Sequence, residues 1–409
     1  MRILVLTQYF WPEDFRINDV VLGLQALGHD VVVLTGKPNY PGGRLFPGYG
    51  VFGQTRERYG AVQVLRVPLV PRGGGGGLRL AINYLSFALF ASLVGPLRCR
   101  GGVDAILVFE PSPVTVGIPA LVMKALKRAP LLFWVQDLWP ESLSATGAIR
   151  SPRVLRAVDA LVRRIYAGCE RVLVQSRAFI APVAATGVPR ERIVYLPNSA
   201  EALYRPLPAD TPVPGAALPA GFRVMFAGNI GAAQSFETTL AAAEMLREHS
   251  SIHWIVLGEG RQFERVKEQV RSRHLESTVH LLGRRPVSEM PAWFSQADVM
   301  LVTLRKEPIF ALTIPSKVQS YLACGRPVVA ALDGEGARVV RESGGGLAAD
   351  AEDARGLASA VLEIYRMPRD QREAMGRSGR DYYLREFDRD MLLGRLDRCM
   401  KDVAAGTFR

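Results

Sequence analysis

Apolar positions follow two different periods along the first half of the chain. An apolar run covers residues 3–9, and between residues 14 and 27 apolar side chains recur every three or four positions. Gly28 and His29 end that helical pattern, and a second apolar run follows at once. Such alternation predicts a doubly wound parallel sheet. Strands are predicted at 31–35, 62–67, 105–109, 131–135 and 172–175.

The alternation stops at a proline-rich segment and then begins again. Residues 205–215 suit neither helix nor strand. Beyond them, strands are predicted at 223–227, 252–257, 279–282, 299–303 and 328–332, with helices at 235–248, 261–273, 288–296 and from 354 onward. We therefore expect an α/β protein with two Rossmann-like, doubly wound parallel-sheet domains facing across a cleft. Their expected ranges are 1–204 and 223–385, with a linker at 205–222 and a helical tail at 386–409 that packs back on the N-terminal domain.

Composition narrows the class of partner. The chain has 409 residues, 48% of them hydrophobic, and a formal net charge of +12, which favours an acidic partner. A zinc finger, an aromatic RNA-binding signature and a lysine-rich tail are all missing from the sequence, so we expect no nucleic acid. The four cysteines form no C-x-x-C pair, and the first apolar run is too short for a signal peptide. A reduced, cytoplasmic location is expected.

One long stretch without charge raises the question of a membrane. Residues 80–97 contain no charged side chain, and arginines stand at 79, 98 and 100. Eighteen residues is close to the shortest span of a bilayer, but polar residues interrupt the stretch and it lies within one predicted sheet domain. We expect a helix in the membrane interface, held by an anionic surface. A buried core helix with a solvated basic flank is the alternative.

The start of the helix after the 299–303 strand carries the strongest chemical signal. Pro315 suits a first helical turn, Thr313 and Ser316 are capping types, and Gly325 suits a left-handed C-terminal stop. Lys317 adds an ammonium where the backbone N–H groups of the first turn are free. This combination predicts a site for an anion, most simply the diphosphate of a nucleotide. An ordinary capped helix is the alternative.

Acidic and basic residues also follow the strands of the first half. Asp137 comes directly after the 131–135 strand, where a carboxylate can accept a proton from a hydroxyl or orient it. It is the first catalytic candidate, with Glu13 as the second, and an N-cap role is the alternative for Asp137. Glu110, Glu141 and Lys37 are candidates for binding an acceptor. A surface charge is the alternative for Glu13, Glu110 and Lys37.

Several blocks of sequence, in order, resemble a known family. They are Trp-Pro-Glu at 11–13, Gly-Lys-Pro-Asn-Tyr-Pro at 36–41, Asp-Leu-Trp-Pro-Glu-Ser at 137–142, Gly-Asn-Ile-Gly at 228–231 and Pro-Ser-Lys-Val-Gln-Ser-Tyr-Leu-Ala-Cys-Gly at 315–325. The chain resembles the retaining nucleotide-sugar glycosyltransferases of family 4, which have the GT-B fold. Within the family it looks like the branch that builds bacterial O-antigen and capsule units and includes N-acetyl-L-fucosamine transferases.

The resemblance implies a set of residues that bind the sugar donor, and it also shows departures from the family pattern. Ser320 stands where most members have an acidic residue for the ribose, and Leu312 replaces a glutamate that touches the donor sugar. Asn229 and Gln234 replace an arginine and a lysine. The implied donor-binding residues are Gly228, Asn229, Gln234, Gly258, Arg284, Pro315, Ser316, Lys317 and Ser320.

The function implied is transfer of a sugar, N-acetylated in this branch, from a UDP-sugar to a saccharide on undecaprenyl diphosphate. Such an enzyme serves O-antigen, lipopolysaccharide or capsule synthesis as a peripheral protein on the cytoplasmic face of the inner membrane. We expect no cofactor and no metal, because the one D-x-D pattern, at 388–390, lies in the helical tail. The alternatives are a UDP-sugar 2-epimerase of the same fold and a non-catalytic, membrane-associated scaffold.

Overall fold

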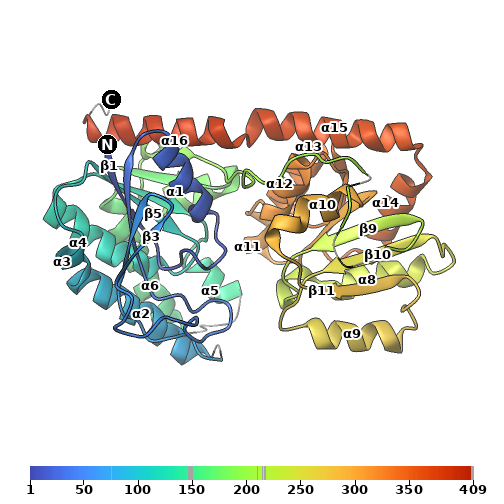
Figure 1. The fold of residues 1–409 in the computed structure, drawn as a ribbon, viewed down its shortest axis with the longest axis horizontal. Coiled ribbons are helices and arrows are strands. Elements are labelled where there is room, and N and C mark those ends of the chain that lie inside the picture. The colour runs from blue at the N-terminus through green and yellow to red at the C-terminus, as the bar shows by residue number, and fades with distance from the viewer. Residues whose placement is uncertain (75, 146–150, 210, 214, 216–217, 407–409) are drawn as a thin grey trace. The chain divides into compact units, whose positions relative to one another are not determined.

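The chain folds into two α/β units, each described here by itself. The computed structural model describes residues 1–74, 76–145, 151–209, 211–213, 215 and 218–406. Unit 1 comprises Met1–Pro197 together with Asp390–Arg409, and unit 2 comprises Asn198–Arg389 (Figure 1).

Unit 1 is built on a sheet that is parallel except at one edge. Within the described residues its strands are ordered β3-β4-β2-β1-β5-β6-β7-β8, and β3 runs antiparallel to β4. The central strands are buried along nearly their whole length, as expected for a parallel sheet with helices on both faces. The strands are β1 Arg2–Leu6, β2 Asp30–Thr35, β3 Arg56–Tyr59, β4 Val62–Arg66, β5 Ala105–Glu110, β6 Leu131–Val135, β7 Arg171–Val174 and β8 Ile193–Tyr195.

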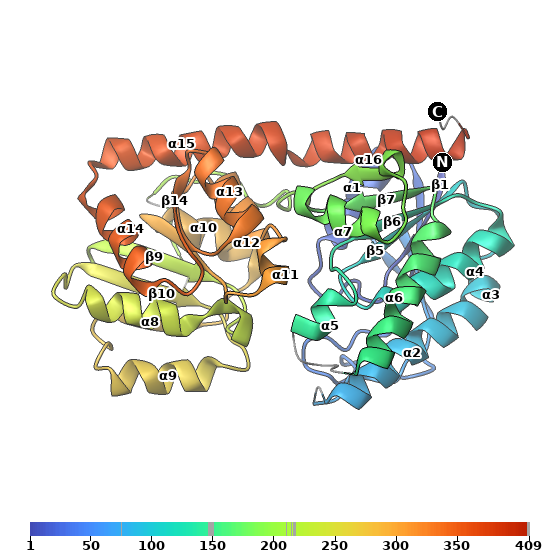
Figure 2. The same ribbon diagram turned by 180° about the vertical axis from the view of Figure 1, so that it is seen from behind.

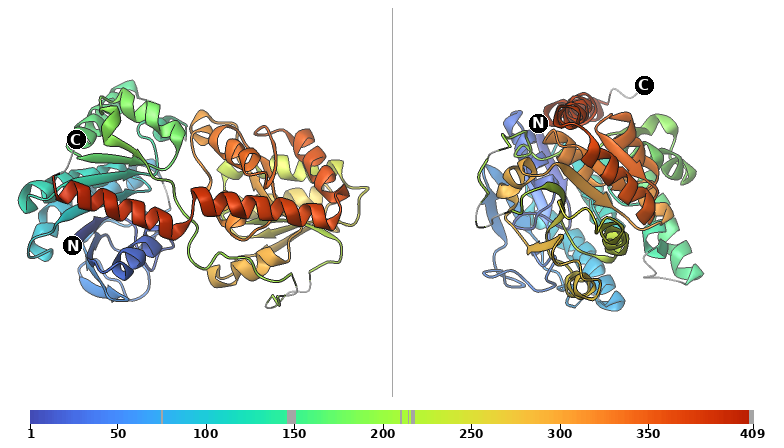
Figure 3. Two further views of the ribbon diagram at one scale, coloured as in Figure 1. Left: turned by 90° about the horizontal axis from the view of Figure 1, so that it is seen from above. Right: turned by 90° about the vertical axis from the view of Figure 1, so that its right-hand side faces the viewer.

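Helices from both ends of the chain cover the sheet of unit 1. Helices α1 and α16 bury apolar side chains in one core with β1 and β2, and α16 runs beside α1 (Figures 1 and 3). Helices α2, α3, α4 and α6 lie together on the other face (Figure 2). The bounds are α1 Ile17–Ala26, α2 Gly77–Leu93, α3 Gly95–Arg98, α4 Gly117–Lys127, α5 Glu141–Ala145, α6 Pro152–Ala167, α7 Ile180–Ala185 and α16 Arg389–Ala404.

Unit 2 repeats the same plan with an entirely parallel sheet. Its described strands are ordered β11-β10-β9-β12-β13-β14, so the first strand of the unit lies near the centre. Every pairing in this sheet is parallel. The strands are β9 Phe222–Ala227, β10 Ile252–Leu257, β11 Val279–Gly283, β12 Val299–Thr303, β13 Val328–Ala331 and β14 Gly346–Ala349.

Two separate cores lie on the two faces of the unit 2 sheet. One contains buried residues of α10, α12, α13 and α15, and the other those of α8, α9 and α14. The helices are α8 Phe236–Met245, α9 Phe263–Ser272, α10 Met290–Ser295, α11 Pro308–Ala311, α12 Ser316–Ala323, α13 Gly334–Glu342, α14 Ala354–Arg366 and α15 Arg369–Glu386.

The predicted strands are all present, whereas three further strands were not predicted. These are β3, β8 and β14, which are three or four residues long and too short for a clear alternation. The uncharged stretch at 80–97 forms most of α2 and α3, and among the described residues no helix is long and apolar enough to cross a membrane. The proline-rich segment is counted with unit 2, where Gln296 Nε2 donates hydrogen bonds to the carbonyls of Ala209 and Thr211.

Candidate donor and acceptor sites

The loops after β9, β10 and β11 are joined by backbone hydrogen bonds at the carboxyl end of the unit 2 sheet. Gly228 N–H donates to Leu257 O at 2.8 Å, and Gly258 N–H donates to Gly283 O at 2.8 Å. Ile230 N–H donates to Glu259 O at 2.9 Å. This edge is where parallel α/β sheets bind their ligands, so the three loops form a preformed floor for one.

Two glycines allow these loops to approach one another. A Cβ atom at Gly258 would lie 1.9 Å from Gly228 O, and at Gly228 it would lie 2.5 Å from Lys317 Cε. Both have positive φ, +150° and +139°. Any larger residue would separate the loops or displace the lysine.

Lys317 stands in the first turn of α12 against this floor. Among the described residues no hydrogen-bond acceptor or carboxylate pairs with its ammonium, and its Nζ lies 4.9 Å from the centre of the Phe226 ring. Burial lowers the pKa of Lys317 from 10.5 to about 8. An ammonium held without an anion beside a helix start is suited to receive one from a ligand.

The start of α12 differs in detail from the predicted cap. The N-cap residue is Pro315, and no side chain caps the helix, because Thr313 Oγ1 donates to Phe310 O at 3.0 Å instead. Ser316 is exposed at the first helical position, and the nearly buried Ser320 donates its hydroxyl to Ser316 O at 3.2 Å. The prediction of capping by Thr313 or Ser316 is therefore wrong, whereas Gly325 has the predicted positive φ of +65°.

The other predicted donor-binding residues occupy different positions around the floor. Asn229 is exposed, and Gly260 packs close to its side chain. Gln234 Oε1 accepts the Gly231 N–H at 3.0 Å, so this amide stabilises its own loop. Arg284 follows β11 and is exposed.

Two buried residues that the sequence did not single out hold α12 in place. The Tyr321 hydroxyl accepts the Ala227 N–H at 3.1 Å and donates to Ala227 O at 3.2 Å. Gln319 Nε2 donates to Asn198 O at 2.6 Å. A tyrosine in an amphipathic pattern gives no signal in the sequence that its hydroxyl bonds the end of a strand.

In unit 1, Asp137 lies just beyond β6 and remains partly accessible. Its Oδ1 accepts a hydrogen bond from the hydroxyl of Ser142 in α5. Burial raises the pKa of Asp137 from 3.8 to about 6, although the Ser142 hydroxyl and the Leu138 N–H oppose this shift. A carboxylate with that pKa is ionised at neutral pH and can still take up a proton.

Glu110 and Glu141 differ in access. Glu110 ends β5 and is completely buried. The prediction that it binds an acceptor is therefore wrong, because an acceptor cannot reach it. Burial raises its pKa well above the usual range, and the charge of Asp137 adds to the shift. Glu141 is exposed at the first residue of α5, and its contact with an acceptor stays a prediction.

Glu13 is engaged by the backbone around it. Its Oε1 accepts the N–H groups of Asn39 and Tyr40, each at 2.7 Å, and its Oε2 accepts that of Phe10 at 3.2 Å. Glu13 is 2% exposed, and burial raises its pKa to about 7. These bonds join the loops after β1 and β2, so we do not carry Glu13 into the chemistry.

Lys37 has a similar structural role. Its side chain is 1% exposed and its Nζ donates to the backbone carbonyls of Gly53 and Gln54, the latter at 2.6 Å. Burial lowers its pKa to about 8, and the charges of Arg66 and Arg98 act in the same direction. The predicted contact with an acceptor phosphate is therefore corrected: the ammonium fixes the 50–54 loop.

Each unit thus retains one group suited to a ligand. Unit 2 offers an anion the Lys317 ammonium, which no described residue pairs by a hydrogen bond or a carboxylate, at the positive end of α12. Unit 1 offers a partly accessible carboxylate to a hydroxyl. Among the described residues no group of three or more His, Cys, Asp or Glu side chains is placed to hold a metal ion. Metal independence stays a prediction.

Comparison with known families accounts for most of the chain. Residues 15–199 match the model of the glycosyl transferase 4-like domain, and residues 221–367 match the model of glycosyl transferases group 1. The two matches correspond to the two units and include Asp137 and Lys317 respectively.

Individual proteins agree with the family models. A putative colanic acid biosynthesis glycosyl transferase, WcaI of Escherichia coli K12, is 27% identical over 337 residues, which cover 80% of this chain and 82% of that protein. A probable glycosyltransferase, WbjE of Pseudomonas aeruginosa, is 28% identical over 236 residues, 56% of this chain and 58% of that protein.

A solved structure extends the agreement to the fold. Anabaena HepE, crystallised with UDP and glucose, superposes with a TM-score of 0.68 at 17% identity, covering 98% of this chain and 99% of that one. At this identity the match speaks for the fold alone. The models and relatives favour neither an epimerase nor a scaffold. The chain belongs to the family 4 glycosyltransferases and has the GT-B fold.

Proposed function

We propose that this glycosyltransferase moves a sugar, N-acetylated in its natural donor, from a UDP-sugar to a saccharide carried on undecaprenyl diphosphate, with retention at the anomeric carbon. The reaction serves bacterial surface polysaccharide synthesis at the cytoplasmic face of the inner membrane. The colanic acid name of one relative supports the pathway class, and the UDP bound by HepE supports the nucleotide.

The observation that carries the proposal is the Lys317 ammonium, for which the described part of the chain supplies no hydrogen-bond acceptor and no carboxylate. A diphosphate placed at the start of α12 meets this charge, the positive end of the helix and the backbone of the glycine-rich loops. The same groups stabilise the diphosphate as it leaves with the charge of the broken glycosidic bond, so they act on both binding and rate. Residues 229 and 234 are the neutral Asn229 and Gln234, so they add no positive charge to this site.

On the acceptor side we assign Asp137. Its partly accessible carboxylate accepts or orients the proton of the attacking hydroxyl, and the hydroxyl of Ser142 fixes its rotamer. Glu110 behind it is buried and favours its neutral form, which keeps a second negative charge away from Asp137.

Titration with UDP tests the donor site directly. Lys317→Ala should weaken UDP binding about ten- to a hundredfold, because a charge-assisted hydrogen bond is lost. Lys267→Ala removes a lysine of α9 from the same unit and should leave the dissociation constant unchanged. Equal affinities of the Lys317 variant and the parent protein would refute the donor-site assignment.

A product assay tests the reaction class. A panel of UDP-sugars is incubated with lipid-linked GlcNAc, and the masses of the products are measured by mass spectrometry. One sugar should be added only when both substrates are present. Conversion of a UDP-sugar in the absence of acceptor would instead support the epimerase.

A further inference from the structure

A cavity in unit 2 lies at the amino ends of β9, β12 and β13. Its volume is about 580 Å³, and its walls also include part of the proline-rich segment, the ends of α10 and α12 and the beginning of α15. Because the described strands of this sheet are all parallel, the cavity lies at the edge opposite the loops with the donor-site candidates. The six residues of β9 extend about 20 Å, so the cavity is separate from the proposed donor site.

Arginine dominates the lining of this cavity. Within the described part of the chain, the basic residues that line it are Arg223, Arg326, Arg369, Arg372 and Arg377, and the acidic ones are Asp298 and Glu373. The lining therefore has three more positive than negative charges. We call this cavity the arginine pocket.

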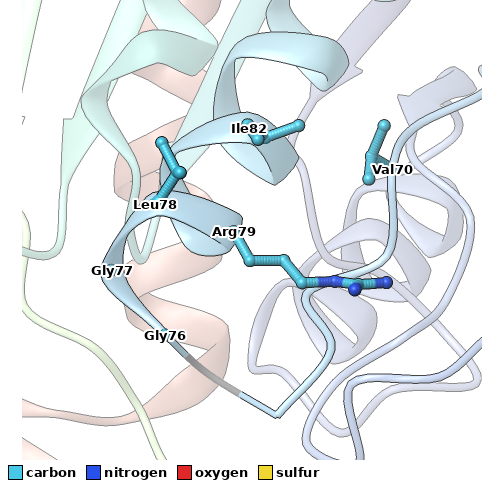
Figure 4. Close-up of a pocket in the computed structure, with 6 residues that line it drawn as sticks. All are labelled: Val70, Gly76, Gly77, Leu78, Arg79 and Ile82. Carbon is cyan, nitrogen blue, oxygen red and sulfur yellow. The ribbon is translucent and has the colours of Figure 1, made fainter.

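A cavity of similar size in unit 1 shows what is unusual about this lining. It has a volume of about 570 Å³ and lies at the beginning of α2, where Val70, Leu78 and Ile82 line it with apolar side chains (Figure 4). Arg79 is the one cation among the described residues around it. The two cavities thus differ in charge rather than in volume, and the arginine pocket is the one suited to an anion.

Glu373 pairs with two exposed arginines of α15 in the arginine pocket. Its Oε1 accepts a hydrogen bond from Arg369 Nε at 2.8 Å, and its Oε2 lies 3.9 Å from Arg377 Nη1. Exposed ion pairs of this kind contribute little to stability and rearrange easily. A ligand with more charge than one carboxylate can therefore compete with Glu373 for both guanidinium groups.

Arg326 and Arg372 are less exposed and keep N–H groups for a ligand. Arg326 donates from Nη1 to Ala297 O and from Nη2 to Leu207 O, and both distances are 3.4 Å. Arg372 uses Nη1 for a backbone carbonyl, whereas its Nη2 lies 3.5 Å from Asp298 Oδ1. The usual N–H···O distance is about 2.7–3.2 Å, so the three long contacts are weak. A guanidinium has five N–H donors in a planar fork, which matches the oxygens of a phosphate.

We propose that the arginine pocket binds a small metabolite that carries two phosphate groups. One phosphate ester has a charge of about −1.5 to −2 at neutral pH, so one alone does not balance three excess positive charges. The arginines come from β9, from the loop after α12 and from α15, which suits two phosphates bound at separate points. Small-molecule sites have volumes of about 300–1,000 Å³, and this cavity lies within that range. The proposal goes beyond the transfer reaction and does not depend on which sugar is transferred.

Calorimetric titration with inorganic pyrophosphate tests the site, because this probe has two phosphates and neither sugar nor base. The Lys317→Ala protein is the starting point, so that the proposed donor site does not contribute, and it should bind one pyrophosphate. Adding Arg326→Met and Arg372→Met together should weaken that binding at least about a hundredfold, since each charge-assisted hydrogen bond contributes about tenfold or more. Arg326→Lys keeps the charge but loses the fork, and it should weaken binding about tenfold.

Exposed positions of the pocket give a readout that misfolding cannot imitate. Glu373→Gln removes a competing carboxylate and should tighten pyrophosphate binding about two- to fivefold, whereas Arg377→Ser should weaken it by a similar factor. The matched control is Arg265→Ser with Arg271→Ser, which removes two exposed arginines of α9 from the same unit. This control should leave the affinity unchanged.

Three results would overturn the proposal. They are no pyrophosphate binding by the Lys317→Ala protein, parent-like binding after the two methionine substitutions, and an equal loss of affinity in the α9 control, which would indicate attraction to the overall charge. Competition with a nucleoside diphosphate and with a sugar bisphosphate then separates two sources of paired phosphates. Displacement of pyrophosphate by either supports the proposal, and displacement by neither would exclude a metabolite of this kind.

Discussion

Lys37 and Lys317 have similarly lowered pKa values, but their ammonium groups differ in what they contact. Each belongs to a loop or helix start beyond the carboxyl end of a parallel sheet, and burial lowers the pKa of each to about 8. Lys37 donates to two backbone carbonyls of its own unit, whereas no described residue accepts from Lys317. A lowered pKa therefore does not separate a structural lysine from a candidate for ligand binding, whereas the hydrogen bonds that each ammonium makes do.

The same contrast holds for carboxylates in unit 1. Glu13 accepts three backbone N–H groups and holds two loops, while Asp137 has the hydroxyl of Ser142 and remains partly accessible. Both follow a strand and both have raised pKa values. Glu13, which stabilises the loops, and Asp137, the candidate catalytic group, are distinguished only by their hydrogen-bond partners and their solvent access.

Gly258→Ala should have the largest effect on stability and UDP affinity. The added Cβ atom would displace the loops after β9 and β10, against which Lys317 packs. A Cβ atom 1.9 Å from Gly228 O and a φ of +150° together should cost about 3 kcal/mol or more of unfolding free energy. Urea unfolding and UDP titration should both show the loss. Gly102→Ala, where nothing lies within 4 Å of the new atom, is the control, and equal stability of the two variants would contradict the role of the floor.

Substituting methionine at the two lysines should lower stability at position 37 but not at position 317. Lys37→Met removes charge-assisted bonds to two carbonyls and should cost about 1.5–3 kcal/mol, with UDP affinity unchanged. Lys317→Met removes a partly buried charge that no described residue accepts as a hydrogen-bond donor, and it should leave the free protein as stable or about 1 kcal/mol more stable, with UDP affinity reduced. Urea unfolding of both variants checks this. A destabilised Lys317 variant would contradict this expectation and show that the contact of the ammonium with the Phe226 ring stabilises the fold.

The pH dependence of transfer should report the two groups left for ligands. Because Asp137 must be ionised, kcat should fall below about pH 6, and because Lys317 must be protonated, UDP affinity should fall above about pH 8, each approaching tenfold per pH unit. Asp137→Asn should lower kcat at every pH with UDP affinity unchanged. Lys317→Ala should abolish the alkaline fall in UDP affinity, and its persistence in that variant would assign the fall to another group.

The sequence was sufficient for the architecture, because apolar runs alternating with helical periods mark buried parallel strands. The order Pro-Ser-Lys before an amphipathic pattern is a local signal, so the sequence also predicted Lys317 at a helix start, and its role in donor binding stays a prediction. The sequence could not show that Glu13 and Lys37 form hydrogen bonds with the backbone. Their partners at 39–40 and 53–54 are N–H and C=O groups, which every residue type carries. The contacts of Tyr321 likewise depend on which face of a helix meets the sheet.

The double hydrogen bond of Tyr321 to Ala227 bears on how donor preference diverges within the family. It ties α12 to the end of β9, and Gln319 ties the same helix to Asn198, so these buried contacts hold α12 independently of residue 320. Ser320, where the family pattern has an acidic residue, can therefore differ between members while α12 stays in place, and with it Lys317 of the proposed donor site. In such an arrangement, single substitutions can change which sugar is preferred, and each intermediate protein still binds its nucleotide.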